Sequence, residues 1–78
     1  MNLQAPEQIP ALVRKAKSHA VLADEAAAIA LALEGQRHWA EAVLIRASAR
    51  NHCIRRLEIL ANIGALEAGL NRREPNRA

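Results

Sequence analysis

Apolar residues recur along this chain at intervals of three and four in two long segments. That spacing matches the turn of an α-helix and predicts that each segment forms a helix with one broad apolar face. Nowhere do four or more residues alternate with the period of a β-strand, so we predict an all-α fold. The first segment carries two apolar lines, one of Ile9, Val13, Ala16, Ala20, Ala23, Ala27 and Ala30 and one of Leu22, Ala26, Ile29 and Leu33.

The second segment begins near Arg37 and keeps the helical period as far as Gly64. Its apolar residues also fall on two neighbouring lines, which together predict a second amphipathic helix. One line comprises Trp39, Ala42, Ala49, Cys53, Leu60 and Ile63, and the other comprises Val43, Ala47, Ile54, Leu57, Ala61 and Gly64.

Proline and glycine predict the outer limits of the two helices. Pro10 is expected in the first turn of the first helix, where a missing amide hydrogen is tolerated. Gly69 is expected to end the second helix. We therefore predict a flexible N-terminus over residues 1–9, a helical domain over 10–69 and a flexible basic tail over 70–78.

Two positions leave the number of helices open. Asp24 and Glu25 form an acidic pair of the kind that begins helices, so the first segment could break near residues 22–24. Asn51 could cap a new helix, so the second could break near residues 48–51. Unbroken periodicity favours continuous helices, and the sequence predicts an antiparallel helical hairpin or a small three-helix bundle.

The two segments meet at a glycine-centred turn that also holds the only aromatic residue. Gly35 can adopt a left-handed backbone conformation at little cost and is expected to end the first helix. Trp39 is expected to fall back across the hairpin and, with Ala42, to anchor the corner. A buried tryptophan removes about 150–250 Å² from water, which is worth about 4–6 kcal/mol.

The composition predicts one small domain that needs a partner. Half of the 78 residues are apolar, but alanine supplies much of this fraction and phenylalanine and tyrosine are absent. A chain of this size buries only about 60% of its unfolded surface, so a monomer would be marginally stable. We expect a homodimer, with a small monomeric bundle as the alternative.

Positive charge is concentrated in the second half of the chain. The net charge is +3, and residues 36–78 hold eight basic against four acidic side chains. At 100° per residue these arginines spread around the helix, which disfavours a base-reading edge and favours contact with a protein. A weak contact with nucleic acid remains an alternative. The arginines expected to form the partner-binding surface are Arg46, Arg50, Arg55 and Arg56.

The sequence offers little for catalysis or metal binding. His19, His38 and His52 do not share the spacing of ligands on one helix face, and Cys53 falls on an apolar line, so we expect no metal, cofactor or catalytic site. One cysteine allows no intramolecular disulfide. Residues 26–33 form the longest apolar run, too short to cross a bilayer, and no secretory signal precedes it, so a cytoplasmic location is expected.

Residues 25–60 contain an alanine-rich helix, a short turn and a second helical segment. The residues of this pattern are Leu33 and Glu34 before the turn, and Trp39, Ala42, Ala47, Ala49, Asn51, Cys53, Arg55 and Arg56 after it. This pattern resembles the small ANR and PerC-like transcriptional regulators of bacteria and their phages and plasmids. The resemblance implies gene regulation in the cytoplasm, in some members through binding another regulator such as the nucleoid protein H-NS. It implies roles for Trp39, Ala42, Asn51 and Arg56.

We therefore expect a small transcriptional regulator that acts by helix-mediated protein contact. Two alternatives remain at this point. One is a phage-encoded inhibitor that binds a host defence or signalling protein, and the other is a helical domain that binds DNA directly.

Overall fold

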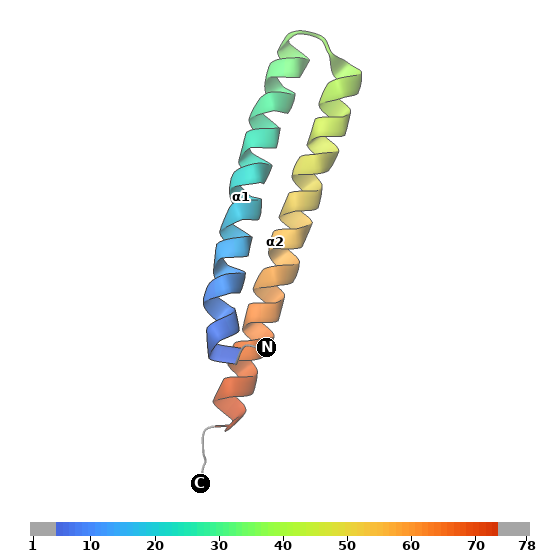
Figure 1. Ribbon diagram of the computed structural model, residues 1–78. Helices are drawn as coiled ribbons and strands as arrows, with labels where there is room; N and C mark the ends of the chain where they lie inside the picture. The colour runs from blue at the N-terminus through green and yellow to red at the C-terminus, as the bar shows by residue number, and fades with distance from the viewer. Residues whose placement is uncertain (1–4, 74–78) are drawn as a thin grey trace.

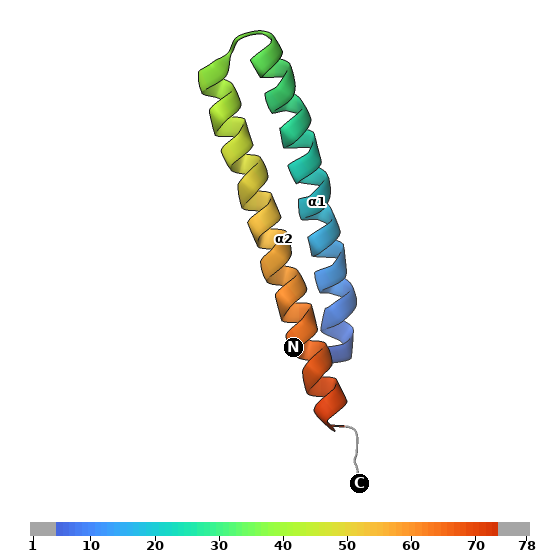
Figure 2. The same cartoon turned by 180° about the vertical axis from the view of Figure 1, so that it is seen from behind.

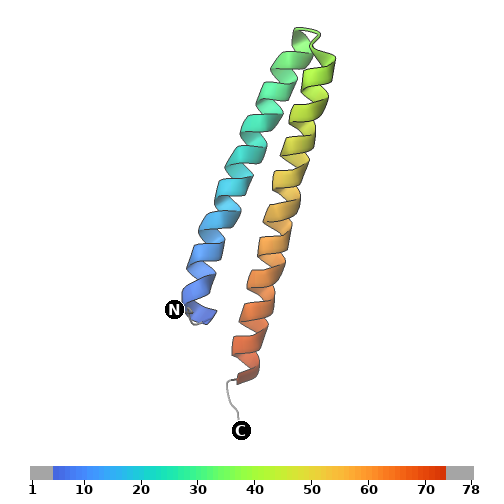
Figure 3. The same ribbon diagram turned by 45° about the vertical axis from the view of Figure 1, so that its right-hand side comes forward.

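The computed structural model describes residues 5–73 and consists of two α-helices, α1 (Ala5–Gly35) and α2 (Trp39–Arg73). They run antiparallel, joined by a turn at one end of the molecule (Figure 1). They stay side by side when the molecule is seen from behind and when it is turned by 45° (Figures 2 and 3). The all-α hairpin is thus confirmed, and no strand occurs among residues 5–73.

Neither helix breaks at the positions left open above. Helix α1 runs through residues 22–24 and α2 runs through 48–51 without interruption. Strong helix formers on both sides of each position outweigh the capping tendency of the acidic pair and the asparagine. The molecule is therefore a two-helix hairpin and not a three-helix bundle.

Both helices are longer than predicted. Pro10 lies inside α1, which already begins at Ala5, so residues 5–9 are helical. Gly69 lies inside α2, which ends at Arg73, because an isolated glycine weakens a helix by about 1 kcal/mol without ending it. The rest of the predicted flexible ends, residues 1–4 and 74–78, lies outside the described part of the chain.

The turn uses Arg37, and not Gly35, in the left-handed conformation. Arg37 has φ 65°, and no glycine has a positive φ. The Arg37 amide donates to the carbonyl of Glu34 at 3.0 Å, and the His38 amide donates to that of Leu33 at 2.8 Å. These two bonds form a Schellman motif, in which the left-handed residue stands two positions after Gly35. The prediction that the first helix ends at Gly35 is confirmed, whereas the prediction that Gly35 takes the left-handed conformation is wrong.

The seam between the helices follows a heptad pattern. Less exposed residues alternate at spacings of three and four on both helices, as in an antiparallel coiled coil. Arg56 falls on this pattern but is exposed. The seam comprises Ile9, Leu12, Ala16, His19, Ala23, Ala26, Ala30 and Leu33 from α1, and Ala42, Ile45, Ala49, His52, Ile59, Ile63, Leu66 and Leu70 from α2.

The core of the hairpin is thin and consists mainly of alanine. The molecule measures 63 × 23 × 15 Å, so its shortest dimension is close to the diameter of one helix. No large side chain is fully buried among the described residues. The buried apolar residues are Ala16, Ala23, Ala30, Ala42 and Ile63.

Trp39 does not anchor the corner. Its side chain is 60% exposed, whereas Ala42 is only 1% exposed. Trp39 is the first residue of α2 and precedes Ala42 by three positions, which places the indole beside the seam and not in it. Ala42 fills the seam near Ala30, as a small residue must where two helices approach closely. The prediction is thus correct for Ala42 and wrong for Trp39.

Candidate functional site

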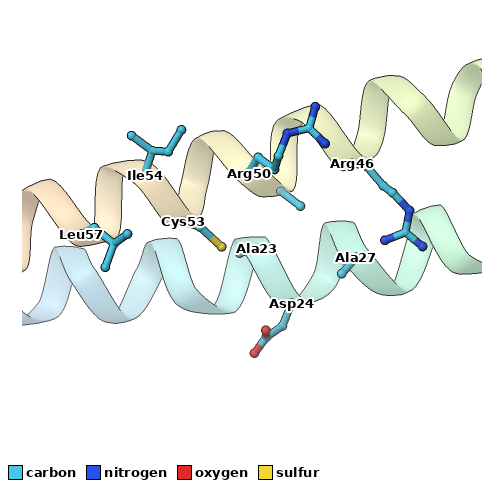
Figure 4. A pocket seen from close by; sticks show the side chains of 9 residues that line it. Ala23, Asp24, Ala27, Arg46, Arg50, Cys53, Ile54 and Leu57 are labelled. Atoms are coloured by element: carbon cyan, nitrogen blue, oxygen red, sulfur yellow. The ribbon is translucent and has the colours of Figure 1, made fainter.

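The hairpin presents two long faces, one on each side of its seam. On the first, an open groove runs between the helices and is lined from α1 and α2 alike (Figure 4). We call this the Cys53 face. Its groove is lined by Ala23, Asp24, Ala27, Arg46, Ala49, Arg50, Cys53, Ile54 and Leu57.

Helical geometry extends the Cys53 face toward both ends of the molecule. Trp39 precedes Leu57 by about five full turns, and Val43 precedes Arg50 by one heptad. Leu60 and Leu31 each follow a groove residue, Cys53 and Asp24, by one heptad, so they also lie on this side. The exposed large apolar residues that this places on the Cys53 face are Leu31, Trp39, Val43, Ile54, Leu57 and Leu60.

The opposite side, the Asn62 face, is more polar. A shallow depression here is lined by Gln8, Ala11, Leu12, Lys15 and Asn62. Leu22 and Ile29 follow Lys15 by one and two heptads, and Leu44 precedes Asn62 by about five turns. These three residues therefore form a smaller apolar patch on this face, with exposed fractions of 44%, 51% and 70%.

Arg46 is engaged within the hairpin. Its guanidinium donates two hydrogen bonds of 2.7 Å to the carboxylate of Glu34, a bidentate pair between α2 and α1. The hydrogen bonds lower the pKa of the Glu34 carboxyl and raise the pKa of the Arg46 guanidinium. The pair ties the helices together near the turn, so Arg46 is not a free cation.

The four arginines predicted to bind a partner do not share one surface. Arg50 lines the same groove as Arg46. Arg55 lies one heptad before Asn62 and thus on the Asn62 face, where it donates to Glu58 at 3.3 Å. Arg56 occupies an exposed position on the seam pattern. Only Arg46 and Arg50 are brought together.

The seam contains a histidine pair that the sequence did not predict. The Nδ1 atoms of His19 and His52 lie 2.8 Å apart, and the ring centroids are 5.1 Å apart. One ring must donate and the other accept, so at least one ring of the hydrogen-bonded pair is neutral. Spacing along a single helix could not reveal this pair, because its members come from different helices. It could be found only with the register of α1 against α2.

The described residues show no metal-binding cluster, an exposed thiol and no membrane-spanning helix. They hold no group of three or more His, Cys, Asp or Glu side chains that could bind a metal ion. Cys53 is exposed in the groove, not buried as its apolar line predicted. Between residues 5 and 73, no helical stretch is both long and apolar enough to cross a membrane.

Comparisons with protein families, with curated proteins and with solved structures found no match to this chain.

Proposed function

We propose that this protein is a small, non-catalytic regulator of transcription that acts by binding another protein through its helices. One observation carries the proposal: among the described residues, ten large apolar side chains are at least 41% exposed, while the buried core consists of four alanines and one isoleucine. Contiguous exposed apolar surface is typical of proteins that bind other proteins. Transcription is the process implied by the resemblance of residues 25–60 to ANR and PerC-like regulators.

The apolar patch of the Asn62 face is the surface we assign to the regulatory partner. Leu22 and Ile29 stand on α1 and Leu44 on α2, so both helices contribute. Charged groups lie on the same face as this patch, including the Arg55–Glu58 pair. An apolar centre with a polar rim is the usual arrangement of a protein interface.

Direct DNA binding is less well supported than protein binding. A DNA-binding surface needs several unpaired cations along one edge to neutralise phosphates. Here Glu34 neutralises Arg46, and Arg55 lies on the other side of the hairpin from Arg50.

The test uses bacterial cells that express the wild-type chain, an Ile29→Glu/Leu44→Glu variant, or Ala28→Glu. Ala28 is exposed on α1 away from both faces and provides a matched control for added negative charge. Cross-linking and affinity capture identify the bound protein, and RNA sequencing measures transcription. We expect the wild type and Ala28→Glu to capture a transcription or nucleoid protein and to change transcript levels, and the Ile29→Glu/Leu44→Glu variant to do neither.

Three results would contradict the proposal. Capture of a defence or signalling protein with unchanged transcripts would support the phage-inhibitor alternative. Purified protein that shifts DNA with a steep salt dependence would support direct DNA binding. Equal activity of the Ile29→Glu/Leu44→Glu variant would show that the patch is not the binding surface.

A further inference from the structure

The hairpin as a whole exposes more surface than a compact domain of its mass does. The chain exposes 5850 Å², whereas a compact monomer of 8.5 kDa is expected to expose about 4,700 Å². The excess of about 1,150 Å² exceeds the roughly 800 Å² that each partner buries in a standard protein interface. A second molecule that covers one face of the hairpin would bury this excess.

Seven residues of the Cys53 face on α2 repeat with the same heptad period as the seam. They alternate at spacings of four and three from one end of the face to the other, which gives α2 a second heptad line. A helix with two heptad lines can pack against two neighbours at once, as helices do in a four-helix bundle. This line comprises Trp39, Val43, Arg46, Arg50, Cys53, Leu57 and Leu60.

We propose that the Cys53 face binds the same face of a second copy, with both turns at the same end, to form a four-helix bundle. In this arrangement α2 of one copy packs on α1 of the other. Neighbouring helices are then antiparallel throughout, which is the favourable orientation of their dipoles. The proposal concerns self-association and does not depend on the identity of the regulatory partner.

Charge complementarity at the middle of the face determines the orientation. Asp24 and Arg50 both line the groove, and neither forms an ion pair within the described residues. The contact between His19 and His52 sets the register of the hairpin, and in that register Asp24 and Arg50 differ in height by only about three residues, or roughly 4.5 Å. With the turns at the same end, Arg50 therefore meets the partner's Asp24, and symmetry repeats the pair.

The opposite orientation is disfavoured by the same charges. With the turns at opposite ends, α2 would pack on α2, and full overlap would bring Arg50 close to Arg50 of the partner subunit. Like charges placed together in an interface disfavour that arrangement. The two orientations therefore make different predictions for the same side chains.

The apolar residues near the turn also favour the orientation with both turns at the same end. In the register given by the histidine pair, Leu31 of α1 stands level with the segment of α2 between Trp39 and Val43. Packing α1 on the partner's α2, turn beside turn, therefore places Leu31 against the partner's Trp39. The indole that is exposed in one hairpin becomes covered in the pair.

The first experiment measures molecular mass by sedimentation equilibrium on the full chain. We expect a mass of twice 8.5 kDa for the wild type. Leu57→Glu should dissociate the pair, whereas Leu44→Glu, the matched change on the Asn62 face, should not. Circular dichroism checks that both variants remain helical. A monomeric wild type, or a dimer lost only in Leu44→Glu, would overturn the proposal.

The second experiment tests the charge pair by exchange. Asp24→Arg and Arg50→Asp should each weaken dimerisation by at least about tenfold, because each places like charges together. The double variant should restore the wild-type affinity. Single variants that dimerise as tightly as the wild type would contradict the predicted contact. A double variant that dimerises more weakly than either single variant would contradict it as well.

The third experiment measures the orientation directly. A ketone-reactive spin label on p-acetylphenylalanine placed at position 36, which leaves Cys53 unchanged, reports the distance between the two turns. Turns at the same end predict a separation of about 10–20 Å, from helix spacings of about 8–10 Å. A separation of about 45–50 Å, which the length of α1 predicts for turns at opposite ends, would overturn the orientation. All three experiments use purified protein, so their failure is distinguishable from a failure of the proposed regulatory role.

Discussion

Replacing Arg37 with glycine should stabilise the hairpin. Arg37 holds a φ of 65° in the turn, a conformation that costs a residue with a Cβ atom about 1–2 kcal/mol. Its side chain makes no hydrogen bond or ion pair among the described residues, so the substitution removes no such contact. Glycine also makes the unfolded chain more flexible, which offsets part of this stabilisation.

The net effect should be a stabilisation of about 0.5–1 kcal/mol. For a chain of this size, that corresponds to a rise in Tm of about 2–8 °C. The assay is thermal and urea unfolding followed by circular dichroism. Wild type and variant must be compared at one protein concentration, because self-association also contributes to stability.

Gly35→Ala provides the matched comparison. Gly35 has no positive φ, and a Cβ atom added there would meet nothing within 4 Å. The variant should therefore be as stable as the wild type or more stable by up to about 1 kcal/mol. Loss of stability in Gly35→Ala together with no gain in Arg37→Gly would refute the assignment of the left-handed residue.

Two further predictions concern polar contacts between the helices. His52→Ala should lower the free energy of unfolding by about 1–3 kcal/mol, because His19 loses its hydrogen-bond partner in the seam. The double variant His19→Leu/His52→Leu should recover this loss when both are measured by urea unfolding. Equal losses in the two variants would contradict a role for the hydrogen bond. The pKa of Glu34 is lowered by Arg46, so its stabilising contribution is present above the ordinary value of 4.5 and is lost as the pH falls through the folded value. The stability difference between wild type and Glu34→Gln should accordingly shrink below pH 4.5, and a difference independent of pH would contradict the pairing.

Periodicity was enough to predict the hairpin but not its seam. Ile9, Ala16, Ala23 and Ala30 were assigned to the apolar face of α1 and do lie in the seam. Because α1 carries alanine on several sides, the pattern could not show that Leu12 and His19 belong to the same seam as these four residues. Propensity alone cannot separate an alanine in the seam from an alanine beside it.

On α2 the difficulty is that two heptad lines share one period. The predicted lines mixed Ala42 and Ile63, which face α1, with Cys53 and Leu60, which lie on the outer face. Hydrophobic spacing does not indicate which line meets the first helix. The same ambiguity explains why Trp39 was predicted to be buried although it is exposed in the single hairpin.

The candidate site depended on register and on pairing, which a single sequence does not contain. The pattern identified a basic second helix correctly, but not that Glu34 engages Arg46 or that Arg55 lies on the other face. The contact between His19 and His52 likewise requires knowledge of which residues of the two helices stand level. The turn misled prediction because a left-handed arginine has no distinctive sequence signal.

In the proposed dimer, a second copy covers the side chains that are exposed on the Cys53 face. Trp39 is the only tryptophan, so its fluorescence reports this face alone. Acrylamide quenching of Trp39 should be measured over a dilution series in which sedimentation gives the mass. We expect quenching to rise as the dimer dissociates, along the same curve as the fall in mass, because dissociation uncovers the indole. Quenching that stays constant through that transition would contradict it.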